Sequence, residues 1–365
     1  MPYKKRIAVL GATGSIGKSS LDIVSRDTEN FEVILLVARS NGRELEKASK
    51  QFPGAVCILE EKDGEEKLLS AIKELKPDIT INGISGAAGL KPSIAAIKAG
   101  SDLALANKET IVMAGQLVTR LAKEKNVNII PVDSEHSAIL HLLRTHRQET
   151  ISEIILTASG GPFRKYNLKE MEKVTVKDAL AHPTWNMGPK ITIDSASMAN
   201  KGLEIIEACV FFNMSTEKIK VVIHPQSIVH SMIRLCNGVI YAQISKPDMR
   251  HPIHDAIYWP VTTPSALEPI NFDNLTLEFF KPDAERFPML SLAREAAKQG
   301  GLYPCAYNAA NEAAVAAFME NRIGFLDIPR ITENVLQSDW TGDNMELDNI
   351  LEADTEARRK TNSNI

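Results

Sequence analysis

The sequence predicts an α/β protein with an N-terminal doubly wound, Rossmann-like parallel sheet, a central α+β catalytic domain with an antiparallel sheet, and a C-terminal helical bundle. Three observations lead to this prediction. Short apolar runs alternate with helical patterns through residues 1–149, strands joined by tight turns dominate 150–259, and Ala-rich helical patterns fill 287–365. The Pro-rich stretch 260–286 lacks helical periodicity, so we expect a linker there.

The N-terminal part is expected to contain six strands separated by helices. The strands are predicted at 6–10, 32–38, 56–59, 78–82, 102–106 and 128–131. The helices are predicted at 18–26, 42–51, 64–75, 90–99, 109–125 and 135–147. Ligands of such sheets bind beyond the carboxyl ends of the strands, so the residues that follow each strand are the first candidates for a site.

Composition excludes several classes of protein. The 365 residues are 44% hydrophobic and carry a net charge of −4, so neither nucleic acid nor an anionic membrane is an expected partner. No run of eighteen apolar residues occurs, and we expect no membrane span and a cytoplasmic location. The cysteines show no metal-binding spacing, so reduced thiols in the core are expected at Cys57, Cys209, Cys236 and Cys305.

A glycine-rich turn follows the first predicted strand. Its sequence, GATGSIG at 11–17, lies between a strand and a helix, which is the context of a dinucleotide-binding loop. An ordinary turn between strand and helix is the alternative. The second strand ends in Arg39, Ser40 and Asn41 instead of the carboxylate typical of NAD sites. An arginine there favours the 2′-phosphate of NADPH, and the alternative is a solvated arginine.

Polar clusters follow the later strands of the sheet. Residues 82–86 (NGISG) follow the fourth strand and would pass close to a cofactor. Asn107, Lys108 and Glu109 follow the fifth strand. Lys108 would stabilise negative charge on a substrate oxygen. The alternative for this cluster is structural, with Asn107 capping the next helix and Glu109 complementing its dipole.

Two carboxylates follow the sixth strand, at Asp133 and Glu135. Like charges so close in sequence repel each other unless a cation lies between them, and oxygen ligands suit Mg²⁺ or Mn²⁺. Capping of the helix 135–147 is the alternative. A third carboxylate, Glu204, lies in a segment suited to phosphate and favours the metal interpretation. The histidines of that helix are expected to be exposed or capping groups: His136, His141 and His146.

The central part is predicted to contain strands at 151–158, 220–224, 228–235 and 239–244, with a short helix at 175–182. The last two strands form a hairpin that could make a dimer seam. Ser159 and the two glycines after it could bind an anion through backbone N–H groups. The alternative is a loop that needs glycines for positive φ.

The segment 182–204 contains few core-forming residues, so it is either a solvated loop or a site, and the order of its parts favours a site. His182 opens a loop that carries Trp185 and Met187. A run of polar residues then leads into a helical pattern that begins near Gly202. Hydroxyl, amide and ammonium groups at a helix N-terminus suit a phosphate. The polar residues of this run are Ser195, Ser197, Asn200 and Lys201.

The C-terminal part contains four Ala-rich helical patterns, at 289–299, 304–321, 327–337 and 343–360. Its polar residues Asn308, Asn311 and Glu312 are expected to pack or to face solvent, without a chemical role.

Six motifs in order give the sequence a specific resemblance. They are GATGSIG at 11–17, ANKE at 106–109, PVDSEH at 131–136, ASGGPF at 158–163, HPTWNMG at 182–188 and DSASMANKGLE at 194–204. Together they resemble the 1-deoxy-D-xylulose 5-phosphate reductoisomerase family over essentially the whole chain. The resemblance implies a homodimeric, NADPH-dependent enzyme of the non-mevalonate isoprenoid pathway that uses Mg²⁺ or Mn²⁺.

The resemblance also implies roles for individual residues. NADPH would be bound by Gly11, Thr13, Gly14, Ser15, Ile16, Arg39, Ser40, Asn41, Asn107, Glu109 and Gly188. The metal would be bound by Asp133, Glu135 and Glu204. A small phosphorylated, sugar-like substrate would be bound by Lys108, Ser134, Glu135, Ser159, His182, Ser195, Asn200, Lys201 and Glu204. A flap over 182–190 would close over it with Trp185 and Met187.

The implied reaction is a metal-assisted rearrangement of 1-deoxy-D-xylulose 5-phosphate followed by reduction to 2-C-methyl-D-erythritol 4-phosphate. Two other functions fit part of the sequence. A semialdehyde-type NADP-dependent dehydrogenase would share the nucleotide domain but would need an activated cysteine, and none lies in a Gly- or Asn-rich polar loop. A non-enzymatic NADP sensor would not need three carboxylates near a phosphate site.

Overall fold

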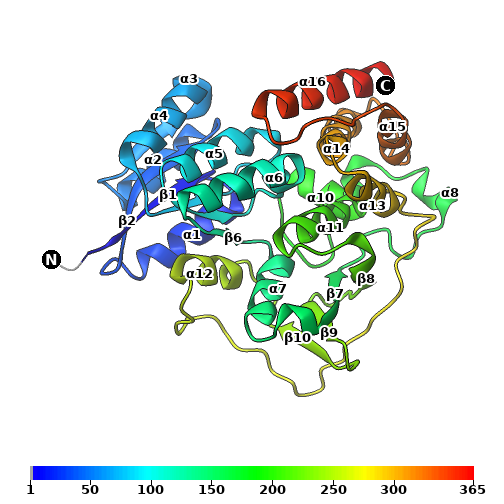
Figure 1. Ribbon diagram of the computed structural model, residues 1–365, viewed down its shortest axis with the longest axis horizontal. Helices are drawn as coiled ribbons and strands as arrows, with labels where there is room; N and C mark the ends of the chain where they lie inside the picture. Colours follow the sequence, from blue (N-terminus) through cyan, green and yellow to red (C-terminus); the bar gives the residue numbers. More distant parts are fainter. Residues whose placement is uncertain (1–2) are drawn as a thin grey trace. The chain divides into compact units, whose positions relative to one another are not determined.

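The computed structural model describes residues 3–365, which form two compact units (Figure 1). The first unit comprises the chain as far as Thr110, together with Val118–Ser137 and Asp248–Leu267. The second comprises Ile111–Leu117, Ala138–Pro247 and Glu268–Ile365. Residues 248–267 therefore belong to the first unit with the N-terminal part of the chain, although they follow the central strands in sequence.

The first unit contains a six-stranded sheet in the order β3-β2-β1-β4-β5-β6, and every pairing in it is parallel. This order confirms the predicted doubly wound sheet, because strands are added first to one side of β1 and then to the other. The carboxyl ends of all six strands therefore lie along one edge. The strands are β1 (Lys5–Leu10), β2 (Phe31–Ala38), β3 (Val56–Leu59), β4 (Ile79–Asn82), β5 (Asp102–Leu105) and β6 (Ile129–Pro131).

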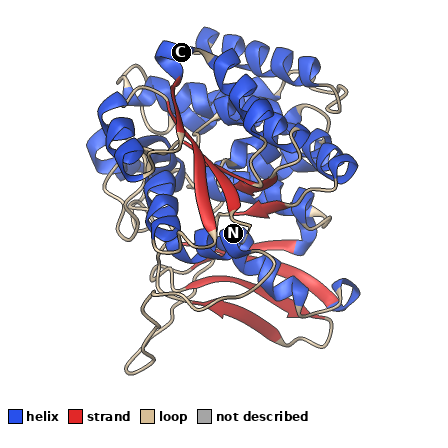
Figure 2. Ribbon diagram, turned by 90° about the vertical axis from the view of Figure 1, so that its left-hand side faces the viewer, coloured by secondary structure: helices blue, strands red, loops and turns tan. Residues whose placement is uncertain are grey.

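Helices cover both faces of this sheet (Figures 1 and 2). In Figure 1, α4 and α5 lie on one face, and α1 and α12 lie on the other. The helices of the unit are α1 (Ser15–Ser25), α2 (Gly42–Gln51), α3 (Glu60–Asp63), α4 (Glu65–Leu75), α5 (Leu90–Lys98), α6 (Lys108–Lys125), α7 (Ser134–Arg144) and α12 (Arg250–Tyr258). Two of them, α6 and α7, also contribute residues to the second unit.

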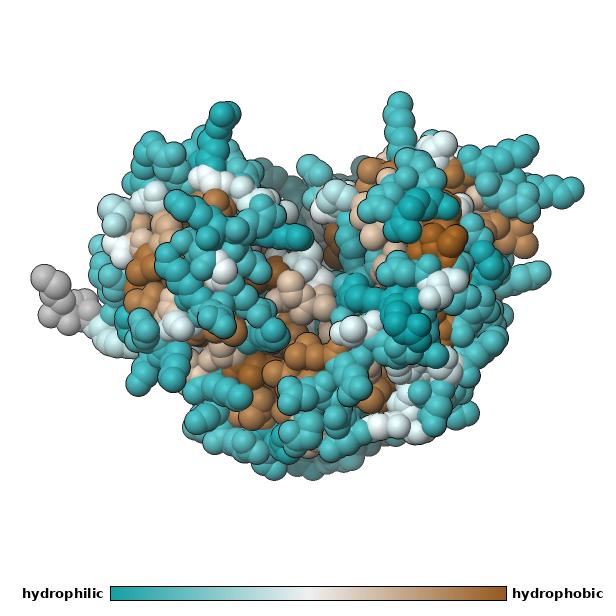
Figure 3. Space-filling view, turned by 90° about the horizontal axis from the view of Figure 1, so that it is seen from above, coloured by the Kyte–Doolittle hydropathy of each residue, from teal (hydrophilic) through white to brown (hydrophobic). Residues whose placement is uncertain are grey.

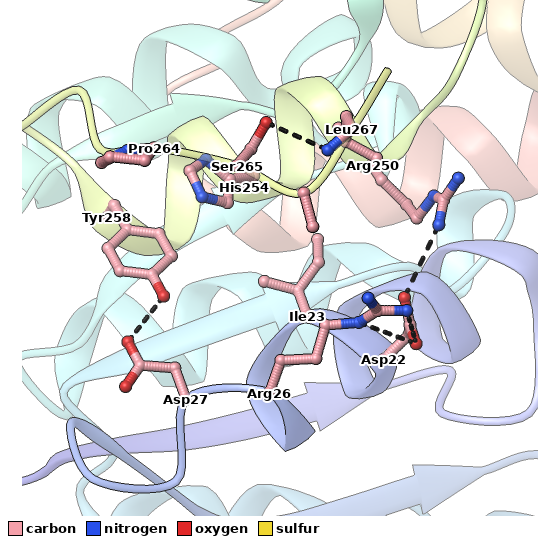
Figure 4. A pocket seen from close by; sticks show the side chains of 11 residues that line it. Asp22, Ile23, Arg26, Asp27, Arg250, His254, Tyr258, Pro264, Ser265 and Leu267 are labelled. Carbon is pink, nitrogen blue, oxygen red and sulfur yellow. Dashed lines mark hydrogen bonds and ion pairs between the residues drawn. The ribbon is translucent and has the colours of Figure 1, made fainter.

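Helix α12 was not expected from the sequence, because Pro252 and two histidines obscure its helical pattern. Burial against the first unit stabilises it: the Tyr258 hydroxyl donates to Asp27 at 2.6 Å, and its ring meets Phe31 edge-on. A pocket of about 290 Å³ lies between α1, α12 and residues 264–267, which line it (Figure 4). The Arg26 side chain lies on one of its walls and is paired with Asp22 of α1.

The second unit contains a four-stranded sheet in the order β10-β9-β7-β8. The expectation of a purely antiparallel sheet was wrong, because β7 and β8 are parallel while the other two pairings are antiparallel. The long connection from β7 to β8 contains four α-helices and allows the parallel pairing, whereas a tight turn forces β9 and β10 to be antiparallel. The strands are β7 (Ile151–Ala158), β8 (Ile219–Ile223), β9 (Val229–Leu235) and β10 (Ile240–Ile244).

Helix α11 packs on β7 and β8, and α13 and α14 of the C-terminal helices pack on α11 (Figure 1). The shared core includes Leu156, Leu203, Ile233 and Phe318. The four predicted C-terminal helices are present. The unit contains α8 (Leu168–Met171), α9 (Val176–Ala179), α10 (Pro189–Ala196), α11 (Ala199–Phe211), α13 (Met289–Gln299), α14 (Tyr303–Met319), α15 (Asp327–Leu336) and α16 (Leu347–Ser363).

Helix α10 contradicts the expectation of a loop before Gly202. Its β-branched residues weaken helical propensity, but Pro189 occupies the first turn, where proline is tolerated, and Thr192, Ile193 and Ala196 are buried. Tertiary packing therefore overrides local preference. Met198, with a φ of 64°, separates α10 from α11, which begins three residues earlier than expected.

The expectation that all four cysteines lie in the core was wrong. Cys305 is buried, Cys209 is half-buried, and Cys57 and Cys236 are exposed. Cys57 is exposed because it lies in the edge strand β3. Cys236 is exposed because it lies in the turn after β9.

Hydrophilic residues cover most of the face drawn in Figure 3. Among residues 3–365, no helix combines the length and apolar character needed to cross a bilayer.

Candidate active site

The glycine-rich turn has the close backbone packing of a dinucleotide loop. Gly11 has a φ of 80°, and a Cβ there would lie 2.8 Å from the Gly83 carbonyl oxygen. A Cβ on Gly17 would lie 2.3 Å from the Gly11 oxygen. Side chains at these positions would therefore push the turn away from β4 and away from its own helix.

Helix α1 presents an open N-terminus at this turn. Gly14 is its N-cap and supplies no side-chain hydrogen bond, and the first turn contains no acidic residue. Both Gly14 and Ser15 are exposed, while Thr13 and Ile16 are half-buried beside them. Uncapped N–H groups and the positive end of the helix dipole are the features that bind phosphate oxygens.

Arg39 lies at the carboxyl end of β2 with 83% of its side chain exposed, and its guanidinium is 3.5 Å from Glu61. Because this pair is solvated, exchanging it for a phosphate partner costs little. Asn41 caps α2 by accepting from the Glu44 amide at 3.1 Å, and the Ser40 carbonyl accepts from the Gly42 amide. Asn41 thus has a structural role in addition to any contact with a cofactor.

Asn107, which follows β5, forms hydrogen bonds with the loop that follows β4. Its Oδ1 caps α6 through the Thr110 amide at 3.0 Å, and its Nδ2 donates to the carbonyls of Ile84 and Gly86. Nδ2 also lies 3.0 Å from a Glu109 carboxylate oxygen. The capping alternative for Asn107 is therefore confirmed, and Asn107 also positions the 83–89 loop.

Lys108 forms a buried ion pair at the same edge of the sheet. Its Nζ lies 2.8 Å from Asp133 Oδ2, and the two side chains are only 6% and 14% exposed. The other Asp133 oxygen accepts from the Glu135 amide at 3.1 Å, so capping and charge pairing occur together. The Ser134 hydroxyl donates to Glu135. The expectation for His136 was wrong: it is fully buried, with Nδ1 3.4 Å from Asp133.

In the second unit, a turn of two glycines follows β7. Gly160 and Gly161 have φ values of 81° and 65°, so both need glycine. A Cβ on Gly161 would lie 2.7 Å from the Ser195 carbonyl oxygen, so the turn packs directly on α10. The Gly161 amide donates to the Ser159 hydroxyl at 3.3 Å. The turn therefore brings the two predicted serines next to each other.

His182 joins these two serines. Its Nε2 lies 3.0 Å from Ser159 Oγ and 3.1 Å from Ser195 Oγ. Its Nδ1 accepts from the backbone amides of Thr184 and Trp185, at 3.1 and 2.9 Å. Because Nδ1 accepts twice, the neutral ring carries its proton on Nε2 and donates toward the serines. Burial lowers the pKa of His182, which favours this neutral form.

The segment after His182 carries the two predicted flap residues, and both are half-buried. The Trp185 ring lies 6.4 Å from the His230 ring, and the Thr184 hydroxyl donates to the Pro225 carbonyl at 3.4 Å. Gly188 is exposed and serves as the N-cap of α10. Ser197, by contrast, is turned into the structure: its hydroxyl donates to the Asp194 carbonyl and accepts from the Ala199 amide.

A buried carboxylate lies in the first turns of α11. Glu204 is fully buried, Asn200 Nδ2 donates to its Oε1 at 2.6 Å, and Lys201 Nζ pairs with its Oε2. The Lys201 side chain is 4% exposed. Two predicted phosphate ligands, Asn200 and Lys201, and one predicted metal ligand, Glu204, therefore form one charged cluster on helix α11.

Two residues next to the proposed phosphate ligands, Asp194 and Asn311, were not predicted to contribute to the site. Asp194 of α10 is buried and bonded to Lys190 and to Asn311 of α14. No sequence pattern links Asn311 to Asp194, because the two lie 117 residues apart.

Several family models and curated relatives match the chain. Residues 7–73 and 60–115 match the model of 1-deoxy-D-xylulose 5-phosphate reductoisomerase, residues 129–212 match that of its C-terminal domain, and 244–360 match that of the DXP reductoisomerase C-terminal domain. Reductoisomerases of this name from Treponema denticola and Pelodictyon phaeoclathratiforme are each 47% identical. The alignments cover 97% of this chain, and 96% and 98% of the relatives.

Solved structures of the same enzyme are also similar. The reductoisomerase from Zymomonas mobilis in complex with NADPH has a TM-score of 0.91 at 40% identity, covering 100% of this chain and 99% of that one. A DOX-P reductoisomerase in complex with NADPH, fosmidomycin and magnesium has a TM-score of 0.91 at 35% identity, covering 99% and 98%. The chain therefore belongs to the 1-deoxy-D-xylulose 5-phosphate reductoisomerase family.

Proposed function

We propose that this protein converts 1-deoxy-D-xylulose 5-phosphate to 2-C-methyl-D-erythritol 4-phosphate with NADPH and a divalent metal. Full-length relatives bear this activity as their name, and a similar structure contains NADPH, fosmidomycin and magnesium. The observation that carries the proposal is the buried carboxylate of Glu204, held between Asn200 and Lys201 in the motif that the family resemblance assigns to metal and phosphate.

Asp133, Glu135 and Glu204 are the proposed ligands of the metal. Each can offer one carboxylate oxygen, and oxygen ligands suit Mg²⁺ or Mn²⁺. Each carboxylate already lies in a charged or hydrogen-bonded setting, through Lys108, Ser134 and Lys201 respectively. When bound, such a metal supplies Lewis-acid polarisation of a carbonyl and holds its oxygens in place.

The proposed phosphate site consists of Ser159, Ser195, Asn200 and Lys201. His182 donates from Nε2 to the serine oxygens, which leaves the serine hydroxyl protons to point toward a ligand. Lys201 supplies the positive charge, and its near-complete burial strengthens its interaction with an anion. Hydroxyl, amide and ammonium donors of this kind suit the oxygens of a phosphate.

Lys108 and Ser134 are proposed to act at the reacting oxygens. A buried ammonium 2.8 Å from Asp133 is positioned to stabilise negative charge that develops on an oxygen. Trp185 and Met187 are proposed to cover the substrate and exclude water, which strengthens every charge interaction beneath them. When bound, NADPH would supply the hydride that reduces the aldehyde formed by the rearrangement.

NADPH is proposed to bind along the carboxyl edge of the parallel sheet. Its pyrophosphate would contact the open N-terminus of α1, and the adenosine with its 2′-phosphate would contact the end of β2. The proposed contacts are Gly11, Thr13, Gly14, Ser15, Ile16, Arg39, Ser40, Asn41, Asn107, Glu109 and Gly188.

We propose further that the protein is a homodimer that pairs through the hairpin of β9 and β10. Strand β10 is an edge strand, and Ile240 and Tyr241 on it and Val239 just before it are 42–45% exposed. An exposed apolar edge strand is a common surface for pairing with a second copy. Tyr241→Lys should shift the protein toward monomer in analytical ultracentrifugation. Tyr166→Lys, at a tyrosine of similar exposure, is the control, and a dimer that survives Tyr241→Lys unchanged contradicts the proposal.

The activity is tested by following NADPH oxidation with 1-deoxy-D-xylulose 5-phosphate. Turnover should stop when EDTA removes divalent metal and should return when Mg²⁺ or Mn²⁺ is added in excess. Turnover that persists without metal, or that never appears, contradicts the proposal.

A semialdehyde-type dehydrogenase fits the structure less well, because that chemistry needs a reactive thiolate. Burial raises the pKa of Cys57 and of Cys305, and it raises the pKa of Cys209 to about 11.

A further inference from the structure

Helix α10 carries Ser195, one of the proposed phosphate ligands. Few features within the helix itself fix its orientation. It contains eight residues, its N-cap Gly188 makes no side-chain hydrogen bond, and the left-handed Met198 follows its C-terminal end. A helix of two turns is unstable by itself, so its position depends on tertiary anchors.

The strongest polar anchor of α10 is Asp194, the residue next to Ser195. Its carboxylate is 1% exposed and accepts from Lys190 at 2.9 Å and from Asn311 Nδ2 at 2.8 Å. Lys190 lies one turn earlier on the same helix, so its bond does not locate α10 relative to anything else. The bond from Asn311 comes from α14 and does locate it.

The orientation of the Asn311 amide follows from its partner. A carboxylate only accepts hydrogen bonds, so the amide nitrogen must face Asp194. The Oδ1 of Asn311 is left buried without a hydrogen-bond partner among the described residues. An apolar residue would avoid this unsatisfied oxygen, so packing alone does not account for an asparagine at this position.

Helix α14 is itself held firmly. Glu312, the next residue after Asn311, accepts from Arg358 of α16 at 2.6 Å, and Arg358 also pairs with Asp354 at 2.8 Å. Asn311 therefore projects from an anchored helix toward a short one.

We propose that Asn311 is a positioning residue for substrate phosphate: through Asp194 it sets the orientation of α10 and hence of the Ser195 hydroxyl. This inference rests on the proposed function, because it takes Ser195 as a phosphate ligand. It assigns to the C-terminal bundle a role in substrate affinity.

The test compares Asn311→Leu with Asn308→Leu. Both asparagines are fully buried on α14 and each leaves Oδ1 unsatisfied, but Asn308 donates to Glu312 and not to Asp194. Asn311→Leu should raise the KM for 1-deoxy-D-xylulose 5-phosphate about tenfold, the effect expected when a carboxylate loses a hydrogen bond. The KM for NADPH should stay unchanged, and kcat should change by less than about threefold. Asn308→Leu should leave all three constants near those of the unmodified protein.

A second variant covers the case in which Asn311→Leu does not fold. In Asp194→Asn combined with Asn311→Asp, the amide and the carboxylate exchange places and the hydrogen bond between α10 and α14 can re-form. This double variant should have a lower substrate KM than Asp194→Asn alone.

An unchanged substrate KM in Asn311→Leu overturns the inference, as does an equal rise in Asn308→Leu or a double variant no better than Asp194→Asn. Failure of the proposed function looks different, because the unmodified protein would then show no turnover at all.

Discussion

Two proposed ligand sites are built in opposite ways: the carboxyl edge of the parallel sheet, proposed for NADPH and here called the nucleotide edge, and the charged cluster of Asn200, Lys201 and Glu204. The nucleotide edge uses backbone N–H groups, glycines and exposed side chains such as Arg39. The charged cluster uses side chains that are almost fully buried, Lys201 and Glu204 among them. Substitutions in the cluster should therefore be costly, because each removes one partner of a buried charge pair, whereas exposed charges at the nucleotide edge can be exchanged cheaply.

The largest effect should follow Glu204→Gln. Loss of a metal ligand removes Lewis-acid stabilisation of the transition state worth several kcal/mol, so turnover should fall by roughly 10²- to 10³-fold or more. NADPH affinity, measured by fluorescence titration, should survive, because the nucleotide edge is built from other residues. Turnover within tenfold of the unmodified protein would show that Glu204 is not a metal ligand. Thermal unfolding of the variant is the control for stability.

A pair of glycine variants separates the two regions. In Gly17→Ala the new Cβ would meet the Gly11 oxygen, and in Gly161→Ala it would meet the Ser195 oxygen. Such overpacking typically costs about 1–3 kcal/mol unless the backbone of the turn shifts. A shifted turn misplaces its ligand contacts, so we expect each variant to raise one Michaelis constant by roughly 10- to 100-fold. Gly17→Ala should raise the KM for NADPH, and Gly161→Ala should raise that for the phosphorylated substrate. If either variant raises both constants equally, the two regions are not independent.

Arg39→Asp should change cofactor choice by a smaller amount. A carboxylate would repel the 2′-phosphate, so the KM for NADPH should rise roughly tenfold while any KM for NADH changes little. Lys50→Asp, on the exposed far end of α2, makes the same change in net charge and is the control. Equal effects on NADPH and NADH would remove the argument for a phosphate contact at Arg39.

The smallest effect should appear in the pH profile. Burial lowers the pKa of His182 from its ordinary 6.5, so the unfolded chain binds a proton there more readily than the folded protein does. The stability that neutral His182 contributes is therefore present above pH 6.5 and is lost as the pH falls below it. Protonation would also abolish acceptance by Nδ1 of the Thr184 and Trp185 amides.

The consequence for activity is measured as kcat/KM between pH 5 and 8. As the pH falls from 8 to 5, the kcat/KM of the unmodified protein should fall about threefold more than the kcat/KM of His182→Gln, because glutamine does not titrate in this range. Titration of the substrate phosphate affects both proteins alike, so it cancels when the kcat/KM of one protein is divided by that of the other. Parallel profiles would mean that the protonation state of His182 does not matter.

Local patterns explain which parts of the fold could be predicted. The parallel sheet followed from alternating apolar strands and helices, and the turn at 11–17 followed from glycine spacing next to a strand. Helices α10 and α12 could not be predicted, because proline and β-branched residues weaken their local signals and burial against neighbouring elements stabilises them. The parallel pairing of β7 with β8 was missed for a related reason: strand patterns carry no information about direction.

The parallel sheet, the glycine-rich turn and the residue types of the proposed substrate site could be inferred from the sequence, because these depend on periodicity and on spacing within short segments. Tertiary structure alone decided which partners those residues have. It decided that His182 joins Ser159 to Ser195, that Glu204 is held by Asn200 and Lys201, and that Asn311 reaches Asp194. Such contacts depend on the packing of helices whose relative positions are not encoded in any short stretch of the chain.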